Sequence, residues 1–207
     1  MHPSSVFHTD EQAARAIIRD NPLATLAANG PDGPLVAIVP LVWNEDEGTL
    51  IGHVARSNPF WTALNGEPAN VSAVFRAADA YVSASAYPSK AEHGRVVPTW
   101  NYIAAEARGH LAFATDPQAV RSSVSALSDQ MEATRPAPWS VDDAPDAYID
   151  KLARAIVAFE IRVTALKGVR KLSQNKSDAD RDGVIADLSR QDAAPTALSD
   201  EMRKAVR

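Results

Sequence analysis

TWNYIAAEARGHLAFA, residues 99–114, determines the fold class, because this long apolar segment suits either a helix or a strand by composition. Gly109 lies in its interior, where a glycine disfavours a helix. The neighbouring segments read as strands, and exposed strand edges need a partner. We therefore predict that residues 99–114 form a strand within a β-sheet.

The segments around this strand have the pattern of successive antiparallel strands. The turns NGPDG (29–33) and NEDEG (44–48) are too short for a helical crossover between parallel strands. The fold class is therefore α+β, mainly β with flanking helices, and a closed or half-closed barrel of about six strands would remove the exposed edges. We expect strands over 23–28, 34–43, 49–55, 70–76, 80–87, 99–114 and 155–168, and helices within 8–22, from Pro59, over 115–132 with Thr115 as cap, and over 144–154.

The composition excludes several function classes. With 21 Lys and Arg against 26 Asp and Glu, the net charge of −5 gives no broad attraction to nucleic-acid phosphates. The chain has no cysteine, which excludes disulfides, thiolate catalysis and Cys-ligated zinc. No apolar run approaches the roughly 20 residues that span a bilayer. We expect no metal site, no membrane segment and a cytoplasmic protein.

The segment GHVARSNPFW (52–61) places His53 and Arg56 directly before an Asn-Pro pair. Asn58 is a good helix N-cap and Pro59 suits the first helical position. The backbone N–H groups at a helix start attract anions, and two potential cations lie beside them. The residues alone leave two interpretations open, an ordinary capped helix that follows a surface arginine, or an anion site.

Three segments together resemble one family. LIGHVARSNPFW, VPTWNYIAAEARG and KLSQNKSDADRDGV, in this order and spacing, are similar to the PaiB-type FMN-binding negative transcriptional regulators. The similarity extends from residue 1 to about residue 190. That family belongs to the split-barrel flavin-binding class, which also includes pyridoxamine-phosphate oxidase.

The resemblance implies a homodimer of six-stranded antiparallel split barrels with FMN at the subunit interface. It implies a split-barrel FMN-binding domain over 1–171 and a C-terminal helical extension and tail over 172–207, where Ser177 and Asp180 form a capping signal. The phosphate would bind near His53, Arg56 and Asn58, because an arginine forms strong charge-assisted bonds to phosphate. Trp100 and Asn101 would contact the ring system, and further donors would come from Lys171, Ser173, Gln174, Asn175 and Lys176.

The chain departs from the family pattern near the ring. Ala37 and Ile38 stand where the family has a threonine or serine followed by a histidine, and Glu106 stands where a histidine is common. Ala84 and Ala86 replace a proline and a tryptophan. The departures affect the ring end of the implied site more than its phosphate end.

Three functions remain open at this stage. The family implies an FMN-binding regulator, and because the chain is acidic and has no helix-turn-helix signature, we expect it to act through ligand state or a partner rather than by reading DNA. The second is an FMN-dependent oxidoreductase that acts on small molecules. The sequence identifies no catalytic acid or base for it, and Glu106, Tyr102 and His53 are the candidates. The third is a paralogue that has lost the flavin.

Overall fold

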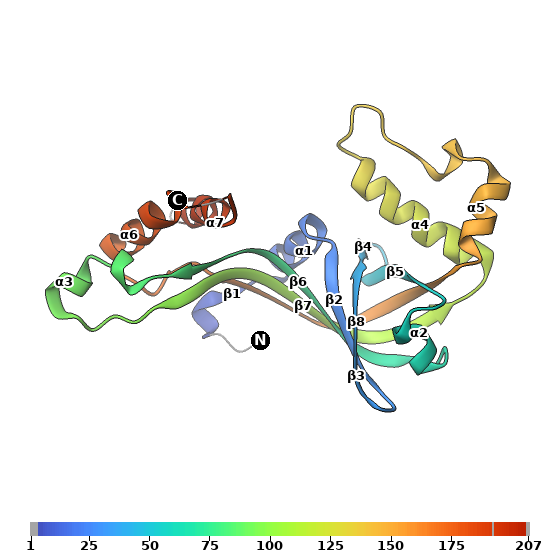
Figure 1. Ribbon diagram of the computed structural model, residues 1–207, viewed down its shortest axis with the longest axis horizontal. Helices are drawn as coiled ribbons and strands as arrows, with labels where there is room; N and C mark the ends of the chain where they lie inside the picture. Colours follow the sequence, from blue (N-terminus) through green and yellow to red (C-terminus); the bar gives the residue numbers. More distant parts are fainter. Residues whose placement is uncertain (1–3, 192, 206–207) are drawn as a thin grey trace. The chain divides into compact units, whose positions relative to one another are not determined.

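The computed structural model describes residues 4–191 and 193–205 as an antiparallel β-sheet with helices around it (Figure 1). Within these residues there are eight strands: β1 His8–Thr9, β2 Leu23–Gly30, β3 Gly33–Pro40, β4 Val42–Asn44, β5 Thr49–Ala55, β6 Ala69–Val82, β7 Thr99–Ala114 and β8 Ile156–Lys171. The α-helices are α1 Glu11–Asp20, α2 Pro59–Leu64, α3 Ser89–His93, α4 Pro117–Glu132, α5 Asp146–Ala153, α6 Asp178–Leu188 and α7 Ala193–Lys204. The mainly β, α+β class predicted from the sequence is confirmed.

Residues 99–114 form one continuous strand, β7, as predicted. Gly109 is required within it by a close approach of the neighbouring strand β8. A Cβ atom at this position would lie 2.3 Å from the carbonyl oxygen of Arg162 and 2.8 Å from the side chain of Ile161. The glycine that argued against a helix therefore allows two strands to pack closely.

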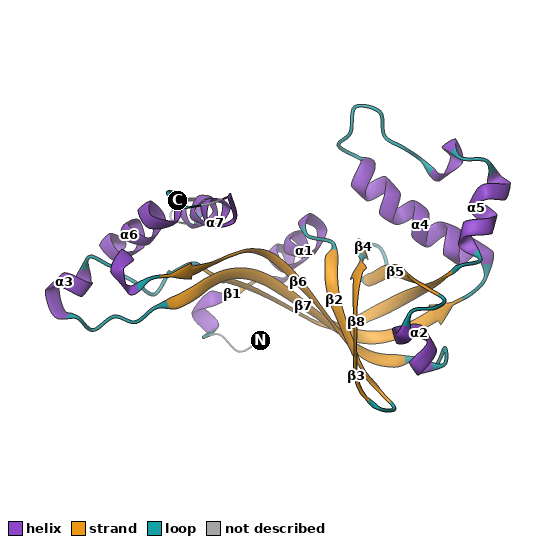
Figure 2. Cartoon of the chain, in the orientation of Figure 1, coloured by secondary structure: helices purple, strands orange, loops and turns teal. Residues whose placement is uncertain are grey.

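The strand order is β3-β2-β6-β7-β8-β5-β4, with β1 paired to β8. The β2–β3 hairpin (Figure 2) and the pairs β2–β6, β4–β5 and β5–β8 are antiparallel, as expected. The predicted count of six strands and the barrel are not confirmed, because the described residues form eight strands in a path that ends at β3 and β4.

The strands differ from the prediction in two places, apart from the unpredicted short strand β1. The predicted strand 34–43 breaks at Leu41, whose backbone N–H donates to the carbonyl of Pro22 at 2.9 Å, so that β3 and β4 are separate. The predicted strands 70–76 and 80–87 are instead one strand, β6, which ends at Val82. A short 3₁₀ turn, Ala84–Ala86, follows β6.

The chain divides into two compact units, each with its own core. The first unit comprises the chain up to Ile17, Arg76–Ala105 and the chain from Lys167, and the second comprises Ile18–Phe75 and Glu106–Leu166. Strands β6, β7 and β8 contribute residues to both units. Fully buried side chains include Tyr87, Leu172, Leu188, Leu198 and Met202 in the first unit, and Leu26, Leu41, Leu50, Phe60, Phe75, Leu111, Phe159 and Ile161 in the second.

The helix starts follow the local capping rules. Asn58 caps α2 and Ser177 caps α6, both as predicted. Helix α4 is capped by Asp116, whose carboxylate accepts from the backbone N–H of Ala119 at 2.8 Å, and the prediction of Thr115 as cap was wrong. Pro117 occupies the first helical position, which makes the residue immediately before it the cap.

The C-terminal segment is more helical than its polar sequence indicated. Helix α7 spans twelve residues and lies beside α6 (Figure 1). Gly183 of α6 allows a close approach to the 3₁₀ turn, because a Cβ there would lie 2.2 Å from the carbonyl oxygen of Ala86. Among the described residues, no helix is both long and apolar enough to cross a membrane.

Candidate functional site

Arg56 follows the last residue of β5 and is held there by two hydrogen bonds. Its backbone N–H donates to the carbonyl of Ala155 at 2.9 Å, and its side-chain Nε donates to the carbonyl of Arg154 at 2.9 Å. No carboxylate within the described part of the chain forms an ion pair with Arg56. Its terminal nitrogens therefore remain available to an anion.

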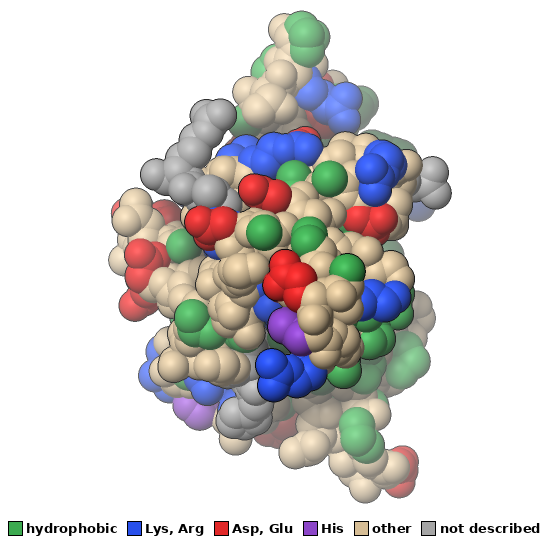
Figure 3. Space-filling model, turned by 90° about the vertical axis from the view of Figure 1, so that its left-hand side faces the viewer, with side chains coloured by type: hydrophobic (Ala, Val, Ile, Leu, Met, Phe, Trp, Pro, Cys, Tyr) green, Lys and Arg blue, Asp and Glu red, His purple; other side chains and the backbone are tan. Residues whose placement is uncertain are grey.

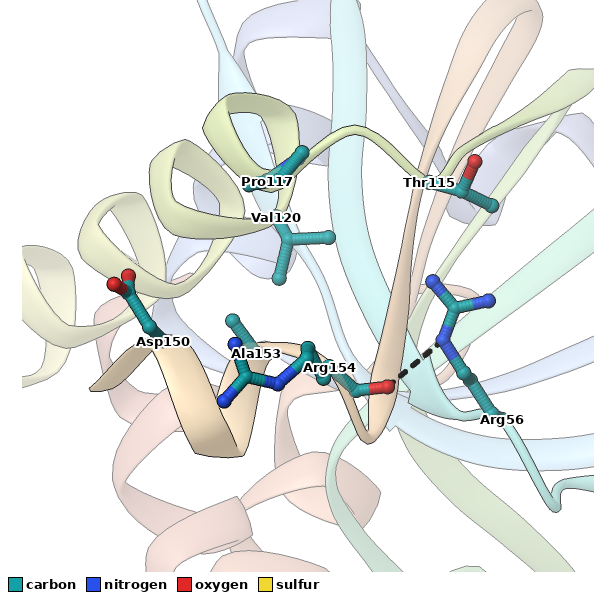
Figure 4. Close-up of a pocket in the computed structure, with 7 residues that line it drawn as sticks. All are labelled: Arg56, Thr115, Pro117, Val120, Asp150, Ala153 and Arg154. Atoms are coloured by element: carbon teal, nitrogen blue, oxygen red, sulfur yellow. Dashed lines mark hydrogen bonds between the residues drawn. The ribbon is translucent and has the colours of Figure 1, made fainter. Parts of the chain in front are cut away.

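A pocket of about 260 Å³ opens beside Arg56, in the second unit (Figure 4). Its polar lining consists of Arg56, Arg154, Asp150 and Thr115. Its apolar lining comes from Pro117 and Val120 at the start of α4 and from Ala153 at the end of α5. The pocket therefore combines two guanidinium groups with a small apolar wall, which suits the anionic end of an organic molecule.

His53 lies on β5, three residues before Arg56, but its surroundings favour the uncharged ring. It is half-buried, and its Nδ1 lies 3.4 Å from the hydroxyl oxygen of Ser123, a buried residue of α4. Burial lowers the pKa of His53 from its ordinary value. Near neutral pH this side chain therefore contributes no positive charge toward a phosphate.

Asn58 uses its side chain to begin a helix. Its Oδ1 accepts a hydrogen bond from the backbone N–H of Phe60 at 2.9 Å. Pro59 at the first helical position has no N–H to offer, and α2 contains only six residues. The charge available for an anion in this segment therefore belongs to Arg56, and Asn58 supports the local backbone.

The first unit brings together residues that are about 70 positions apart in the sequence. Asn101 of β7 is fully buried, and its Nδ2 donates to the hydroxyl oxygen of Ser173 at 2.9 Å and to the sulfur of Met202 at 3.7 Å. The Oδ1 of Asn101 is buried without a partner in the described residues. Ser173 has a φ of 63°, which is uncommon for a residue other than glycine.

Lys171, at the end of β8, also contacts the start of β7. Its ammonium group donates to the hydroxyl of Thr99 at 2.6 Å and to the carbonyl of Trp100 at 2.7 Å. Burial lowers the pKa of Lys171, and the nearby charge of Lys176 lowers it further. The indole of Trp100 is 53% exposed and meets the ring of Tyr81 edge to face at 6.1 Å.

The loop after β8 contains the other predicted donors. Gln174 bonds to the backbone on both sides of its amide, accepting from the N–H of Leu172 and donating to the carbonyl of Arg170. Asn175 is exposed. The ammonium group of Lys176 lies 5.1 Å from the centre of the Tyr87 ring. The loop is therefore partly engaged in its own fold, with Asn175 at the surface.

The predicted site residues thus fall into two groups. His53, Arg56 and Asn58 lie in the second unit, and the other seven lie in the first unit. The structure adds Arg154 and Ser123, which the sequence analysis missed because neither belongs to a motif and each meets its partner only through folding. Within the part of the chain that the structure describes, no cluster of three or more His, Asp or Glu residues could hold a metal ion.

The departures from the family pattern have different surroundings. Ile38 is 62% exposed on β3, whereas Glu106 on β7 is buried and accepts from Arg108 Nε at 2.7 Å and from Ser72 Oγ at 3.0 Å. Burial raises the pKa of the Glu106 carboxyl, but these hydrogen bonds outweigh burial and leave the pKa below its ordinary value. Glu106 is therefore a fixed negative charge, which a histidine at this position would not be.

Known proteins resemble this chain over most of its length. The family model described as "Putative FMN-binding domain" matches residues 1–165. The Uncharacterized protein AN0679 of Emericella nidulans is 33% identical over an alignment of 218 residues, gaps included, and the alignment covers 86% of this chain and 87% of that protein. The Protease synthase and sporulation protein PAI 2 of Bacillus subtilis is 27% identical over 177 residues, which cover 84% of this chain and 82% of that protein.

Solved structures share the fold at low sequence identity. The FAD and Heme binding protein from Mycobacterium smegmatis has a TM-score of 0.61 and 19% identity, and the match covers 83% of this chain and 77% of that chain. The Flavocytochrome Anf3 from Azotobacter vinelandii has a TM-score of 0.60 and 14% identity, and the match covers 87% of this chain and 77% of that chain. Because the family model spans most of the sequence, as its PaiB-type motifs predicted, this chain belongs to the FMN-binding domain family.

Proposed function

We propose that this protein binds FMN and that Arg56 anchors the phosphate of the flavin. The observation that carries the proposal is the unpaired guanidinium group of Arg56, held by its own Nε at the edge of a pocket. An arginine whose terminal nitrogens are free can form paired charge-assisted bonds to phosphate oxygens. The pocket residues therefore fit the phosphate end of the group that the family binds.

In the first unit, Trp100 is proposed as a separate candidate contact for a flavin ring. Its indole is 53% exposed beside Tyr81, so an aromatic surface is available for a planar ring. Asn101 is the next residue of β7, and its buried amide donates to Ser173. Asn175 and Lys176 are further candidate donors from the loop after β8. When bound, the flavin supplies hydride or electron transfer, and the protein positions it.

FMN binding is tested by thermal unfolding in the presence of FMN. At 100 times its dissociation constant a ligand adds about 2.7 kcal/mol to the free energy of unfolding, which raises the Tm of a chain of this size by roughly 5–11 °C. We expect this rise for the wild type and its loss in Arg56→Ala. Arg162→Ala is the matched control, because Arg162 is an exposed arginine of β8 outside the pocket. An unchanged Tm of the wild type with FMN would contradict flavin binding.

The resemblance implies a homodimer, and two copies are proposed to associate through the exposed face of β2 and β3. Leu23, Val36 and Ile38 are 62–63% exposed, and the strand register places them on one face. The opposite face is core, with Leu26 and Val39 buried. A sheet with one buried face normally has polar side chains on the other, so three large apolar residues there indicate a covered surface.

A second copy of the chain is the occupant proposed, because the resemblance to the PaiB-type proteins implies a homodimer. Three exposed apolar side chains on β2 and β3 provide the surface for it. We expect Ile38→Lys to convert a dimer into a monomer in sedimentation-velocity measurements. Val97→Lys is the control, because Val97 is 71% exposed elsewhere in the chain. A wild type that sediments as a monomer would reject the proposed dimer.

We propose further that any role in gene regulation depends on flavin state or on a partner protein. The chain has a net charge of −5, and on the face drawn in Figure 3 the Lys and Arg side chains alternate with Asp and Glu side chains over the described residues. Phosphate-backbone binding needs a basic patch instead. Gel-shift binding to DNA that weakens steeply with salt would overturn this proposal, and turnover of a nicotinamide cofactor with bound FMN would favour an oxidoreductase.

A further inference from the structure

We infer that Arg154 joins Arg56 to form a two-arginine subsite for a phosphate monoester, and that Asp150 limits the affinity of this subsite. For FMN as the ligand, the inference rests on the proposed function. For the phosphate group itself, it rests on the pocket alone. Nothing in the sequence motifs marks Arg154 or Asp150, which lie near the end of α5.

Unpaired arginines are uncommon in this chain. Arg56, Arg95, Arg154 and Arg162 are the arginines of the described residues that have no carboxylate oxygen within 4.0 Å. Two of these four line the same pocket. The two guanidinium groups concentrate positive charge at this pocket, and the single carboxylate in its lining, Asp150, offsets only part of it, which favours an anionic ligand.

Two hydrogen bonds from Arg56 hold the backbone of Arg154 and Ala155 beside it. Arg56 Nε donates to the carbonyl of Arg154 itself, at 2.9 Å, and the N–H of Arg56 donates to the next carbonyl, that of Ala155. These bonds attach the end of β5 to the segment between α5 and β8. Figure 4 shows the terminal nitrogens of Arg56 directed away from the Arg154 carbonyl and toward Thr115. The backbone of Arg154 is therefore fixed beside Arg56. Figure 4 shows the guanidinium group of Arg154 on the Asp150 side of the pocket, so both arginines bind one phosphate when the Arg154 side chain turns toward Arg56.

The size of the pocket indicates which part of a ligand it accepts. Sites for whole drug-sized molecules usually range from about 300 to 1,000 Å³. This pocket has about 260 Å³ and apolar walls formed by Pro117, Val120 and Ala153. It therefore suits a phosphate group and the adjoining carbon chain, while a fused ring system stays outside.

Asp150 opposes the two arginines. It lines the pocket and lies four residues before Arg154, yet no ion pair joins these two side chains. Its carboxylate repels an incoming anion and partly cancels the charge of the arginines. We expect Asp150→Asn to strengthen phosphate binding, while Arg154→Ala weakens it. Opposite effects from two residues on one helix end would not arise from a general loss of stability.

The test is calorimetric titration of the full chain with FMN, with riboflavin and with inorganic phosphate. We expect Arg154→Ala to weaken FMN and phosphate binding about tenfold and to leave riboflavin binding unchanged, because hydrogen bonds to charged groups contribute about this much. Asp150→Asn should strengthen both phosphate-containing ligands about threefold. Arg162→Ala is the control, and unliganded melts confirm that each variant is folded.

The outcomes separate the subsite from the proposed function. If FMN binds the wild type and Arg154→Ala equally, the two-arginine subsite is wrong while FMN binding stands. If the wild type does not bind FMN but binds inorganic phosphate, and Arg154→Ala abolishes the phosphate binding, then the proposal of FMN binding is wrong while the subsite stands. Equal losses for riboflavin and FMN in Arg154→Ala would also overturn the inference, because the arginine would then act on the flavin without its phosphate.

Discussion

Replacing Glu106 by Gln tests whether a buried charge stabilises the sheet. The carboxylate is 7% exposed and its Oε1 accepts from both Arg108 Nε, at 2.7 Å, and Ser72 Oγ, at 3.0 Å. Glutamine has nearly the same volume and keeps one oxygen in this position. The substitution therefore removes the negative charge with little change in packing.

The magnitude follows from the two hydrogen bonds. A bond to a charged group contributes about 1.5–3 kcal/mol and a neutral bond about 1 kcal/mol. Arg108 is 57% exposed, so solvent screens its contribution and the lower values apply. We expect Glu106→Gln to lower the free energy of unfolding by about 1–2 kcal/mol near neutral pH. For a chain of this size the Tm would fall by roughly 2–8 °C.

The pH dependence gives the reasoning a second check. The pKa of Glu106 is lower in the folded protein than its ordinary value of 4.5, so the charge stabilises the fold above that pH. The stabilisation is lost as the pH falls through the folded pKa, and the two proteins should then converge. Calorimetric melts of the wild type, Glu106→Gln and the exposed control Glu160→Gln measure this. Equal melting temperatures near neutral pH, or a gap that persists in acid, would refute the reasoning.

Three further predictions concern other parts of the fold. Burial lowers the pKa of His53 in the folded protein, so the unfolded chain takes up a proton first as the pH falls below 6.5. The Tm of the wild type should therefore drop in this pH range, and pH-dependent melts of His53→Gln should show a smaller drop. Gly109→Ala should cost roughly 1–3 kcal/mol in urea unfolding, because the added Cβ meets the carbonyl oxygen of Arg162, and an unchanged midpoint would contradict the close approach of the two strands. Glu201→Gln should speed hydrogen exchange in α7 but not in β7, because the carboxylate of Glu201 pairs with Arg170 of β8. Equal protection of α7 in the wild type and in Glu201→Gln would mean that packing alone holds the helix.

A site residue could be predicted from the sequence only when the residues that define its role lie close to it in the chain. Arg56 was found because it precedes a helix-capping pair in a recognisable motif. Arg154 was not found, because it reaches Arg56 through a hydrogen bond that joins positions 98 residues apart. The same holds for Ser123, which meets His53 across 70 residues. No local pattern encodes such pairings.

The strand prediction was wrong in two ways: it divided one long strand into two, and it joined two strands that are separate in the structure. Residues 70–76 and 80–87 were predicted as two strands, yet β6 continues through the residues between them. Tertiary pairing overrides weak local propensity in such cases. The break at Leu41 depends in the same way on a hydrogen bond to Pro22, which lies outside the strand.

The sequence by itself determined the class of the fold, the caps at Asn58 and Ser177, and membership of the FMN-binding family. These features depend on alternation, on neighbouring residues and on short motifs, so they can be read locally. Only the tertiary structure decided which donors remain free for a ligand. The side chain of Asn58 caps its own helix, and burial lowers the pKa of His53 and so favours its uncharged ring. Arg56, in contrast, shares a pocket with a second arginine, Arg154. Burial and hydrogen bonding across distant segments control the availability of polar groups, and both exist only after the chain has folded.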